Sequence, residues 1–239
     1  MSPRPRLHHL ALAGVACAAL CAATLLGVRC VDADGALTRP RTVRSVVRHY
    51  SPDVRARFEP QLKRHRIAWP PSRFKLLAFK EEKRLEVWAA NRKGAWAHLV
   101  TYPILAASGR TGPKRREGDL QVPEGFYDLP ILNPNSRFHL SIRVDYPNAE
   151  DVAHAAVPRG KMGGDIYIHG SDVSIGCIAL GDDAISELFT LAALADRRSI
   201  LIAPRDLRGK PTPKADAAWV RDLYARLKRA LASFPAPGR

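Results

Sequence analysis

The stretch DIYIHGSDVSIGC, residues 165–177, joins an apolar strand pattern to a histidine and, eight residues later, a cysteine. His169 ends the apolar run and Gly170 follows it, so the imidazole would project from the end of a rigid strand. A thiol attacks an acyl carbon as the thiolate, and a nearby imidazole can take its proton and return it to a leaving amine. The pattern predicts Cys177 as a nucleophile and His169 as its base. We expect the thiolate to form well below the pKa of about 8.5 of free cysteine.

The residues just before the cysteine offer support for the same reaction. The amides around Ile175, Gly176 and Cys177 could point at a developing oxyanion, and Gly176 would let the chain approach a substrate closely. Ser174 has an alternative structural role, because a serine hydroxyl can cap a turn by bonding nearby backbone amides. Gly170 would turn the backbone away without a side chain that obstructs the site.

Metal binding is the competing chemistry for this stretch. A zinc site uses about three or four ligands, and Cys177, His169 and Asp172 offer three. The sequence has no second C-x-x-C or H-x-x-x-H pair, and His139 and His154 could join only through folding. We therefore expect neither a metal nor an organic cofactor.

The N-terminus indicates export. Basic residues precede an apolar run at residues 10–28, and Val31 and Ala33 place small residues where a signal peptidase needs them. The interpretation is a signal peptide over residues 1–33. Because 19 apolar residues are just long enough to span a bilayer, an uncleaved N-terminal anchor is the alternative. Either way the body of the protein would be periplasmic or otherwise extracytoplasmic, and it would touch the membrane only through this segment.

Cysteine usage makes Cys177 stand out. The chain has four cysteines, and the other three lie at positions 17, 21 and 30, in the leader or at its edge. Without them, Cys177 cannot form an intramolecular disulfide. A lone exposed thiol in an oxidising compartment is a liability unless it has a function, whereas a buried, inert thiol is the alternative.

The formal net charge of +15 favours anionic surroundings such as nucleic acid, phospholipid head groups or an acidic wall polymer. The alternative is a compositional bias toward arginine without a binding role. No run of aromatic residues alternates with basic ones, so we expect no nucleic-acid partner.

Hydrophobic periodicity divides the rest of the chain. Residues 34–72 and 205–239 carry amphipathic helical patterns and predict helical extensions at the two ends. Residues 73–204 alternate as strands, with a hairpin around residues 81–84 and one supporting helix near residues 184–195, capped by Asp182 or Asp183. The fold class is therefore mainly β with α, a β-rich sandwich or barrel-like domain.

The segment HGSDVSIGC resembles the signature of the L,D-transpeptidase catalytic domain, the YkuD-like fold, in which a strand-ending His-Gly precedes S/T-x-G-C. The segment GDLQVPEGFYDL looks like the family's substrate-side segment, with Pro123 and Gly125 before a strand. The similarity covers about residues 74–204 and is greatest to the YafK-like branch. In this resemblance Ser174 and Gly176 match the structural S-x-G element.

The resemblance implies an enzyme of peptidoglycan stem peptides. Cys177 would attack the carbonyl of meso-diaminopimelate and expel the terminal D-alanine, and His169 would be the base. The acyl group would then pass to an amine, as in a transpeptidase, or to water, as in an L,D-carboxypeptidase. Some YafK-like members are hydrolases that release a wall-linked lipoprotein, which makes such a lipoprotein a possible partner. A wall-binding module without catalysis is the alternative from another class.

Two departures from the family pattern leave open whether the acyl group passes to an amine or to water. Ala179 stands where an arginine often follows G-C-I, and residues 171–173 are the whole connection between the two signature elements.

The long loop at residues 109–125 is the expected substrate side. Arg110 and the basic residues at positions 114–116 could meet stem-peptide carboxylates, although a charge run is more often a solvated face. The substrate-binding candidates are Arg110, Pro123, Gly125, Tyr127 and Tyr167.

Overall fold

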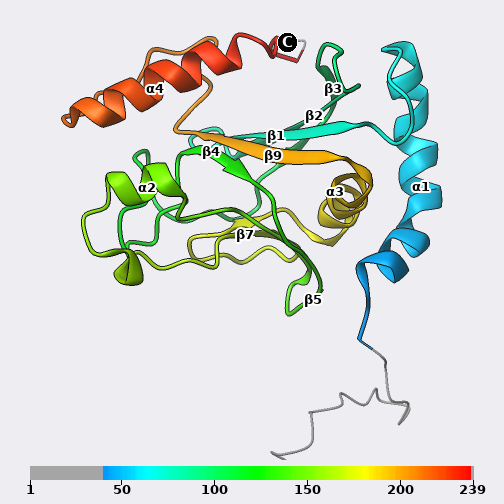
Figure 1. The fold of residues 1–239 in the computed structure, drawn as a ribbon, viewed down its shortest axis with the longest axis horizontal. Coiled ribbons are helices and arrows are strands. Elements are labelled where there is room, and N and C mark those ends of the chain that lie inside the picture. The colour runs from blue at the N-terminus through cyan, green and yellow to red at the C-terminus, as the bar shows by residue number, and fades with distance from the viewer. Residues whose placement is uncertain (1–39, 238–239) are drawn as a thin grey trace, which may run out of the picture. The chain divides into compact units, whose positions relative to one another are not determined.

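The structure is a computed structural model and describes residues 40–237. This part of the chain forms nine strands in two sheets (Figure 1). Inter-residue contacts divide the chain into Met1–Pro40 and Arg41–Arg239, and only the second unit is described below. The predicted signal peptide or anchor at residues 1–33 lies outside the described residues.

The first sheet has five strands in the order β3-β2-β1-β9-β4. β1 and β2 form the predicted antiparallel hairpin, β9 runs parallel to β1, and β4 closes the other edge antiparallel to β9. Their bounds are β1 Arg73–Phe79, β2 Arg84–Ala90, β3 Ala97–Pro103, β4 Gly125–Asp128 and β9 Arg197–Ala203.

The second sheet has four strands in the order β5-β6-β7-β8. β6 pairs antiparallel with β5 and β7, and the short β8 runs parallel to β7. Their bounds are β5 Leu132–Ser136, β6 His139–Arg143, β7 Tyr167–His169 and β8 Ile178–Ala179. The fold is mainly β with α, as the sequence predicts.

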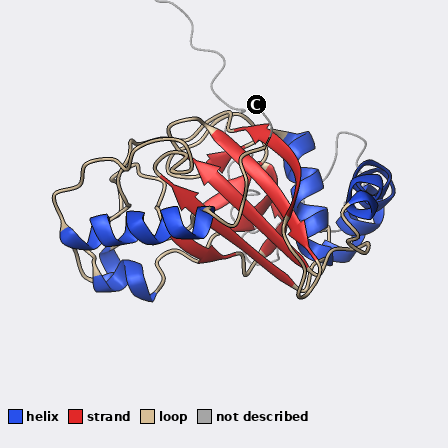
Figure 2. Cartoon of the chain, turned by 90° about the horizontal axis from the view of Figure 1, so that it is seen from above, coloured by secondary structure: helices blue, strands red, loops and turns tan. Residues whose placement is uncertain are grey.

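Strand periodicity sends alternate side chains of β1 into two separate cores. Phe74, Leu76 and Ala78 join a core with Ile168 of β7 and Ile178 of β8. The predicted supporting helix is α3, Asp182–Leu194, whose apolar residues pack into this core. Figure 2 shows the layers from above.

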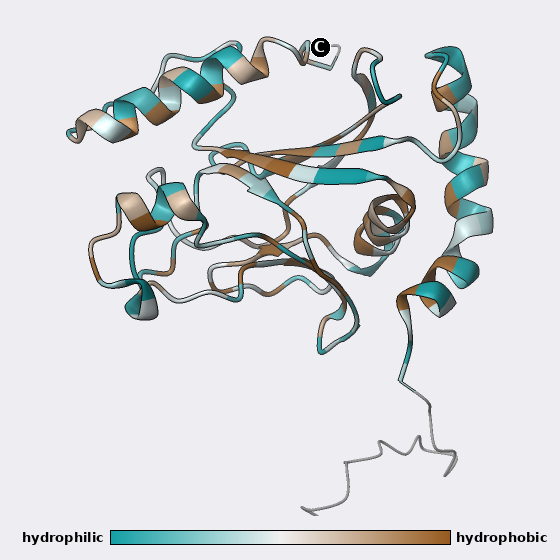
Figure 3. Cartoon of the chain, in the orientation of Figure 1, coloured by the Kyte–Doolittle hydropathy of each residue, from teal (hydrophilic) through white to brown (hydrophobic). Residues whose placement is uncertain are grey.

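The other face of β1 packs under a C-terminal helix. Leu77 and Phe79 form a second core with Leu223 and Leu227 of α4, Ala218–Leu231. Figure 3 shows hydrophobic and hydrophilic positions alternating around α4, as expected for a helix with one buried face. The five-stranded sheet therefore separates two environments, and only one of them contains β7 and β8.

The predicted N-terminal helical extension is a single helix, α1, Val43–Arg64, which runs on through Pro52 and Pro60. Thr42 caps its first turn through a reciprocal bond with Ser45. Apolar side chains spaced along its length pack into the first core, and this packing outweighs the hydrogen bonds lost at the internal prolines.

Two short helical segments complete the described elements, α2 at Ala149–Ala153 and the 3₁₀ turn η2 at Arg159–Lys161. Neither was expected from the sequence, because five and three residues are too few to show a helical period. Among the helices of residues 40–237, none combines the length and apolar character that a membrane crossing requires.

Candidate active site

His169 ends β7 as predicted, and its imidazole is only 3% exposed. Nδ1 lies 2.6 Å from the carbonyl oxygen of Gly170. Because a carbonyl oxygen can only accept, Nδ1 must carry the proton, which leaves the lone pair of the neutral ring on Nε2. The backbone therefore selects the tautomer that a general base needs.

The surroundings also keep this imidazole uncharged. Burial lowers the pKa of His169 below its ordinary value, while the bond to Gly170 opposes that shift. The ring stacks on Phe138 with centroids 4.7 Å apart and an interplanar angle of 29°. At neutral pH the side chain is thus a fixed, neutral base.

Strand pairing places Cys177 on the same side of the sheet as this base. β7 and β8 pair in parallel, with Ile168 opposite Ile178 and His169 opposite Ala179. Side chains alternate along a strand, so Cys177, two residues before Ala179, shares the face of His169.

The thiol itself is held by backbone groups. Sγ accepts from the amide of Tyr167 at 3.4 Å, and the thiol donates to the carbonyl of Asp165 at 3.5 Å. These are the hydrogen bonds of Sγ within residues 40–237, so in the resting state the thiol proton points to Asp165 and not to His169.

The expectation of a thiolate with a depressed pKa is wrong for this resting site. Burial raises the pKa of Cys177, and the nearby carboxylate of Asp165 adds to that shift. The Tyr167 amide and the Lys114 ammonium oppose it without reversing it. Cys177 therefore rests as a thiol and His169 as a neutral imidazole, so attack by the sulfur would require the proton to move as the new bond forms.

Two hydroxyl groups hold the turn that carries the cysteine. The amide of Cys177 donates to Ser174 Oγ at 3.1 Å, which is the turn-capping role considered for that serine. The amide of Gly176 donates to Ser108 Oγ at 2.6 Å. Two of the three amides predicted to form an oxyanion hole are thus occupied, and the third belongs to Ile175, whose side chain is 78% exposed.

Ser108 was missed by the sequence analysis. Its hydroxyl accepts from Gly176 and donates to the carbonyl of Leu120 at 2.8 Å, so one side chain ties the cysteine turn to the loop at residues 109–125. It lies 68 residues from its partner, and no local pattern marks a serine for such a contact.

Both signature glycines are required by geometry. A Cβ on Gly170 would lie 2.4 Å from Asp182 Oδ1 and 2.7 Å from the carbonyl oxygen of Phe138. Gly170 is therefore needed for close packing behind the site. Gly176 has φ +83°, a conformation that favours glycine, whereas an added Cβ would make only ordinary contacts, at 3.8 Å to the carbonyl oxygen of Gln121 and 4.0 Å to Ile166.

The short connection between the signature elements is pinned to α3. Asp182 Oδ1 accepts from the amide of Ser171 at 2.8 Å, and the amide of Gly181 donates to the carbonyl of Ser171 at 2.9 Å. The prediction that Asp182 or Asp183 caps α3 is wrong, because Gly181 is the N-cap residue and no side chain caps it. Asp182 instead orders the loop.

Most of the basic loop is committed to its own fold. Lys114 is buried, and its ammonium binds Asp119 at 2.7 Å and the carbonyl of Arg116 at 2.9 Å. Arg115 lies over the ring of Trp219 at 5.4 Å. Arg110 is exposed, and its backbone amide donates to Gln121. Of these cations, Arg110 and Arg116 are exposed to solvent.

Three of the other substrate-side candidates, Pro123, Gly125 and Tyr127, lie in the interior. Pro123 is buried, and Tyr127 is 4% exposed with its hydroxyl donating to Asp151 at 2.9 Å. Gly125 opens β4 with Tyr127 packed against it. A substrate contact for Pro123 and Tyr127 is therefore not supported, because neither has a free surface. Tyr167 is half-buried and meets the thiol through its backbone.

The histidines considered as extra metal ligands bind elsewhere. His139 Nε2 lies 2.8 Å from Ser186 Oγ, and His154 stacks on Trp219 at 4.5 Å. Within residues 40–237, no three His, Cys, Asp or Glu side chains converge as a metal site would need. Ala179 is buried and bridges Ala106, which leaves no room for the arginine of the family pattern.

Comparison with known proteins was made on sequence and on fold. The family model for the L,D-transpeptidase catalytic domain, YkuD, matches residues 73–202. The provisionally named L,D-transpeptidase YafK of Escherichia coli is 41% identical over 156 residues in both strain K12 and strain O157:H7. The match covers 63% of this chain and 58% of the relative, so the chain spans less than two thirds of the relatives' length.

Solved structures also resemble the fold. The helical cell shape determining protein Pgp2 of Campylobacter jejuni is 27% identical with a TM-score of 0.47, covering 59% of this chain and 50% of that one. L,D-transpeptidase 1 of Mycobacterium tuberculosis is 17% identical with a TM-score of 0.32, covering 54% and 61%.

Proposed function

Because the chain belongs to the YkuD family of L,D-transpeptidase catalytic domains and is YafK-like, we propose that it is a cysteine acyltransferase of peptidoglycan stem peptides. The observation that carries the proposal is the tautomer of His169: its Nδ1 is bound to Gly170, Nε2 makes no hydrogen bond within residues 40–237, and the register of β7 and β8 directs Cys177 to the same face. We further propose that the protein acts outside the cytoplasmic membrane.

The first half-reaction forms a thioester. Sγ of Cys177 attacks the carbonyl carbon of the stem-peptide residue as its proton passes to Nε2 of His169. The tetrahedral intermediate then breaks its C–N bond, and the imidazolium returns the proton to the departing amine. The site begins and ends this step without net charge, which suits the buried imidazole and the raised pKa of the thiol.

The second half-reaction reuses the same groups. An incoming amine or water gives a proton to Nε2 and attacks the thioester carbonyl, and the thiol leaves with that proton. An amine acceptor makes the enzyme a transpeptidase, whereas water makes it a carboxypeptidase or an amidase that frees a wall-linked lipoprotein. Transfer is our proposal, and hydrolysis is the outcome against which it is tested.

The products of a stem tetrapeptide distinguish these activities. We expect mass spectrometry to find a new amide only when an amine acceptor is added, and release of D-alanine in either case. Free acid as the product with the acceptor present would make the protein a hydrolase.

The variant Cys177→Ala separates catalysis from binding. We expect it to abolish every product while leaving sedimentation with peptidoglycan intact. Full activity in this variant would contradict the proposed role of Cys177 as the nucleophile. A wild-type protein that sediments with peptidoglycan in a salt-dependent way and yields no product would instead be a wall-binding module.

A further inference from the structure

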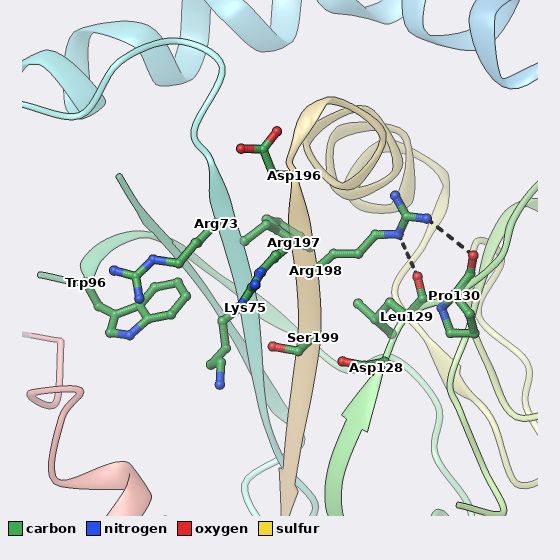
Figure 4. Close-up of a pocket in the computed structure, with 11 residues that line it drawn as sticks. Arg73, Lys75, Trp96, Asp128, Leu129, Pro130, Asp196, Arg197, Arg198 and Ser199 are labelled. Carbon is green, nitrogen blue, oxygen red and sulfur yellow. Dashed lines mark hydrogen bonds between the residues drawn. The ribbon is translucent and has the colours of Figure 1, made fainter. Parts of the chain in front are cut away.

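A cavity of about 640 Å³ lies on the face of the five-stranded sheet that α4 covers only in part (Figure 4). α4 packs on the later residues of β1 and β9, and the cavity opens over the residues with which both strands begin. We call it the basic trough, and the residues that matter for its chemistry are Arg73, Lys75, Trp96, Asp128, Arg197 and Ser199.

Strand pairing concentrates positive charge in the trough. Arg73 of β1 lies opposite Arg197 of β9, and Lys75 lies opposite Ser199. Paired residues on neighbouring strands point to the same face, and like charges placed opposite each other destabilise a sheet. The pairing of β1 with β9 nevertheless keeps these cations side by side.

Neutral carbonyl groups hold two guanidinium groups that border the cavity. The guanidinium of Arg73 donates to the carbonyls of Asn91 and Gly94 and lies 4.6 Å from the centre of the Trp96 ring. Arg198 donates to the carbonyls of Leu129 and Pro130 (Figure 4). Carbonyl partners orient these guanidinium groups without cancelling their charge.

Lys75 is the cation whose situation points most directly to a ligand. Its ammonium is half-buried and lies 5.6 Å from the centre of the Trp96 ring. Among residues 40–237 it has no hydrogen-bond acceptor and no ion-pair partner within contact distance. Burial and the neighbouring Arg73 lower its pKa, and Asp128 opposes this from further away. Its ammonium lies over the rings of Trp96 and Phe234 and has no carboxylate partner among the described residues, so an anion in the trough would supply the missing charged partner.

The trough also contains carboxylates at its rim. Asp128 is exposed, and Asp196 is exposed and paired with Arg92 at 3.0 Å. Three cations on the trough face of the sheet, Arg73, Lys75 and Arg197, and two carboxylates line the cavity, so it favours a ligand with both signs of charge and an excess of negative groups. Arg198 also borders the cavity, but it lies opposite Phe74 and its guanidinium bonds to Ala192 of α3 on the other side of the sheet. A volume of this size suits a small ligand or a short chain segment.

We propose that the basic trough binds a short acidic peptide whose carboxylates meet Lys75 and Arg197 and whose free amine meets Asp128. This site lies across the five-stranded sheet from Cys177, because β7 and β8 belong to the core on the opposite face. The bound peptide is therefore distinct from the one that would react at the thiol, and the inference does not depend on the proposed function.

The indole N–H signal of Trp96 provides a reporter inside the trough. Its resonance is assigned with Trp96→Phe and followed by nuclear magnetic resonance while the full chain is titrated with a diaminopimelate-containing tetrapeptide. We expect a saturable shift in the wild type and equally in Cys177→Ala. Inorganic phosphate is titrated in parallel, and we expect its dissociation constant to be at least tenfold higher than that of the tetrapeptide.

Paired variants test the assignment of the binding residues. Lys75→Met with Arg197→Gln should weaken tetrapeptide binding at least tenfold, because it removes both contacts to carboxylates. Lys228→Met with Arg229→Gln removes the same charge from the exposed side of α4 and should leave the shift unchanged. Turnover at Cys177 should stay within about twofold in both, since neither pair touches the reacting atoms.

Three results would overturn the proposal. They are an unmoved Trp96 signal, equal weakening in the two double variants, and phosphate binding as tightly as the tetrapeptide. Thermal unfolding checks that the variants are folded, and removal of like charges should leave the double trough variant at least as stable as the wild type. The exposed single variant Arg197→Gln keeps the test available if the double variant does not fold. Loss of products in Cys177→Ala, by contrast, bears only on the proposed function.

Discussion

The two halves of the candidate active site are held in different ways. His169 ends a strand within the four-stranded sheet, with its ring buried against Phe138 and its Nδ1 fixed by the next residue. Cys177 follows a turn that depends on the hydroxyls of Ser174 and Ser108, and the second of these comes from a distant loop.

The sheet thus fixes the position of His169, whereas contacts between loops fix the position of Cys177. His169 is positioned by sheet pairing, so a change behind it should cost stability. Cys177 is positioned by side-chain contacts between loops, so a change there should lower the rate and leave the fold intact.

Removal of the base should have the largest effect. For His169→Ala we expect a loss of about 10³-fold in kcat/KM for the acylation step, measured by D-alanine release, because the variant loses the imidazole that takes the thiol proton and returns it to the leaving amine. His154→Ala, which removes an imidazole that stacks on Trp219, is the control and should stay within about twofold. Equal activity of the two variants would remove His169 from the mechanism.

A methyl group behind the base should cost stability. In Gly170→Ala the new Cβ meets Asp182 Oδ1 and a backbone carbonyl, and we expect the free energy of unfolding to fall by about 2–3 kcal/mol in urea denaturation. Gly164→Ala is the matched control, because no heavy atom lies within 4 Å of its added Cβ, and it should change stability by about 0.5 kcal/mol or less. Similar stability of the two variants would show that the packing behind His169 is not tight.

The dependence of activity on pH should reflect a neutral His169 imidazole and a protonated Cys177 thiol. Because burial lowers the pKa of His169, the base stays neutral to a lower pH than usual, and kcat/KM should fall about tenfold per unit only below pH 6.5. Because burial raises the pKa of Cys177, iodoacetamide should alkylate it fast only above the ordinary range for cysteine. Rapid alkylation at pH 6 would indicate a preformed thiolate and contradict this resting state.

Loss of the inter-loop hydroxyl should lower the rate alone. For Ser108→Ala we expect about a tenfold decrease in kcat, which corresponds to one lost hydrogen bond, with little change in unfolding. Ser108→Thr keeps the hydroxyl and should recover most of the rate. If Ser108→Ala is as unstable as Gly170→Ala, the two halves of the site do not differ in the way described.

Sequence reasoning works well where the signal is local. The hairpin of β1 and β2, the strand that His169 ends and the amphipathic α4 all follow from periodicity over neighbouring residues. The turn-capping role of Ser174 is also local and is confirmed. The roles of Cys177 and His169 in chemistry stay predictions.

The features that were missed depend on pairings between distant segments. β5 contains Asn-Pro-Asn, which resembles a loop, and forms a strand only because β6 pairs with it. The raised pKa of Cys177 comes from burial that no sequence motif reveals.

The cations illustrate the same limit. The contiguous basic run at residues 114–116 attracted the substrate-binding interpretation, yet Lys114 is bound internally. Arg73 and Arg197 come together only because β1 and β9 are neighbours in the sheet. Charge clustered in sequence was therefore a poor guide to charge that is free to bind a ligand.

The most direct test of the central claim is the intact mass of the protein during reaction with a stem tetrapeptide. The account predicts a covalent adduct equal to the tetrapeptide minus its terminal D-alanine, located on Cys177 by peptide mapping and absent in Cys177→Ala. Product formation with no adduct on Cys177, or an adduct on another residue, would contradict it.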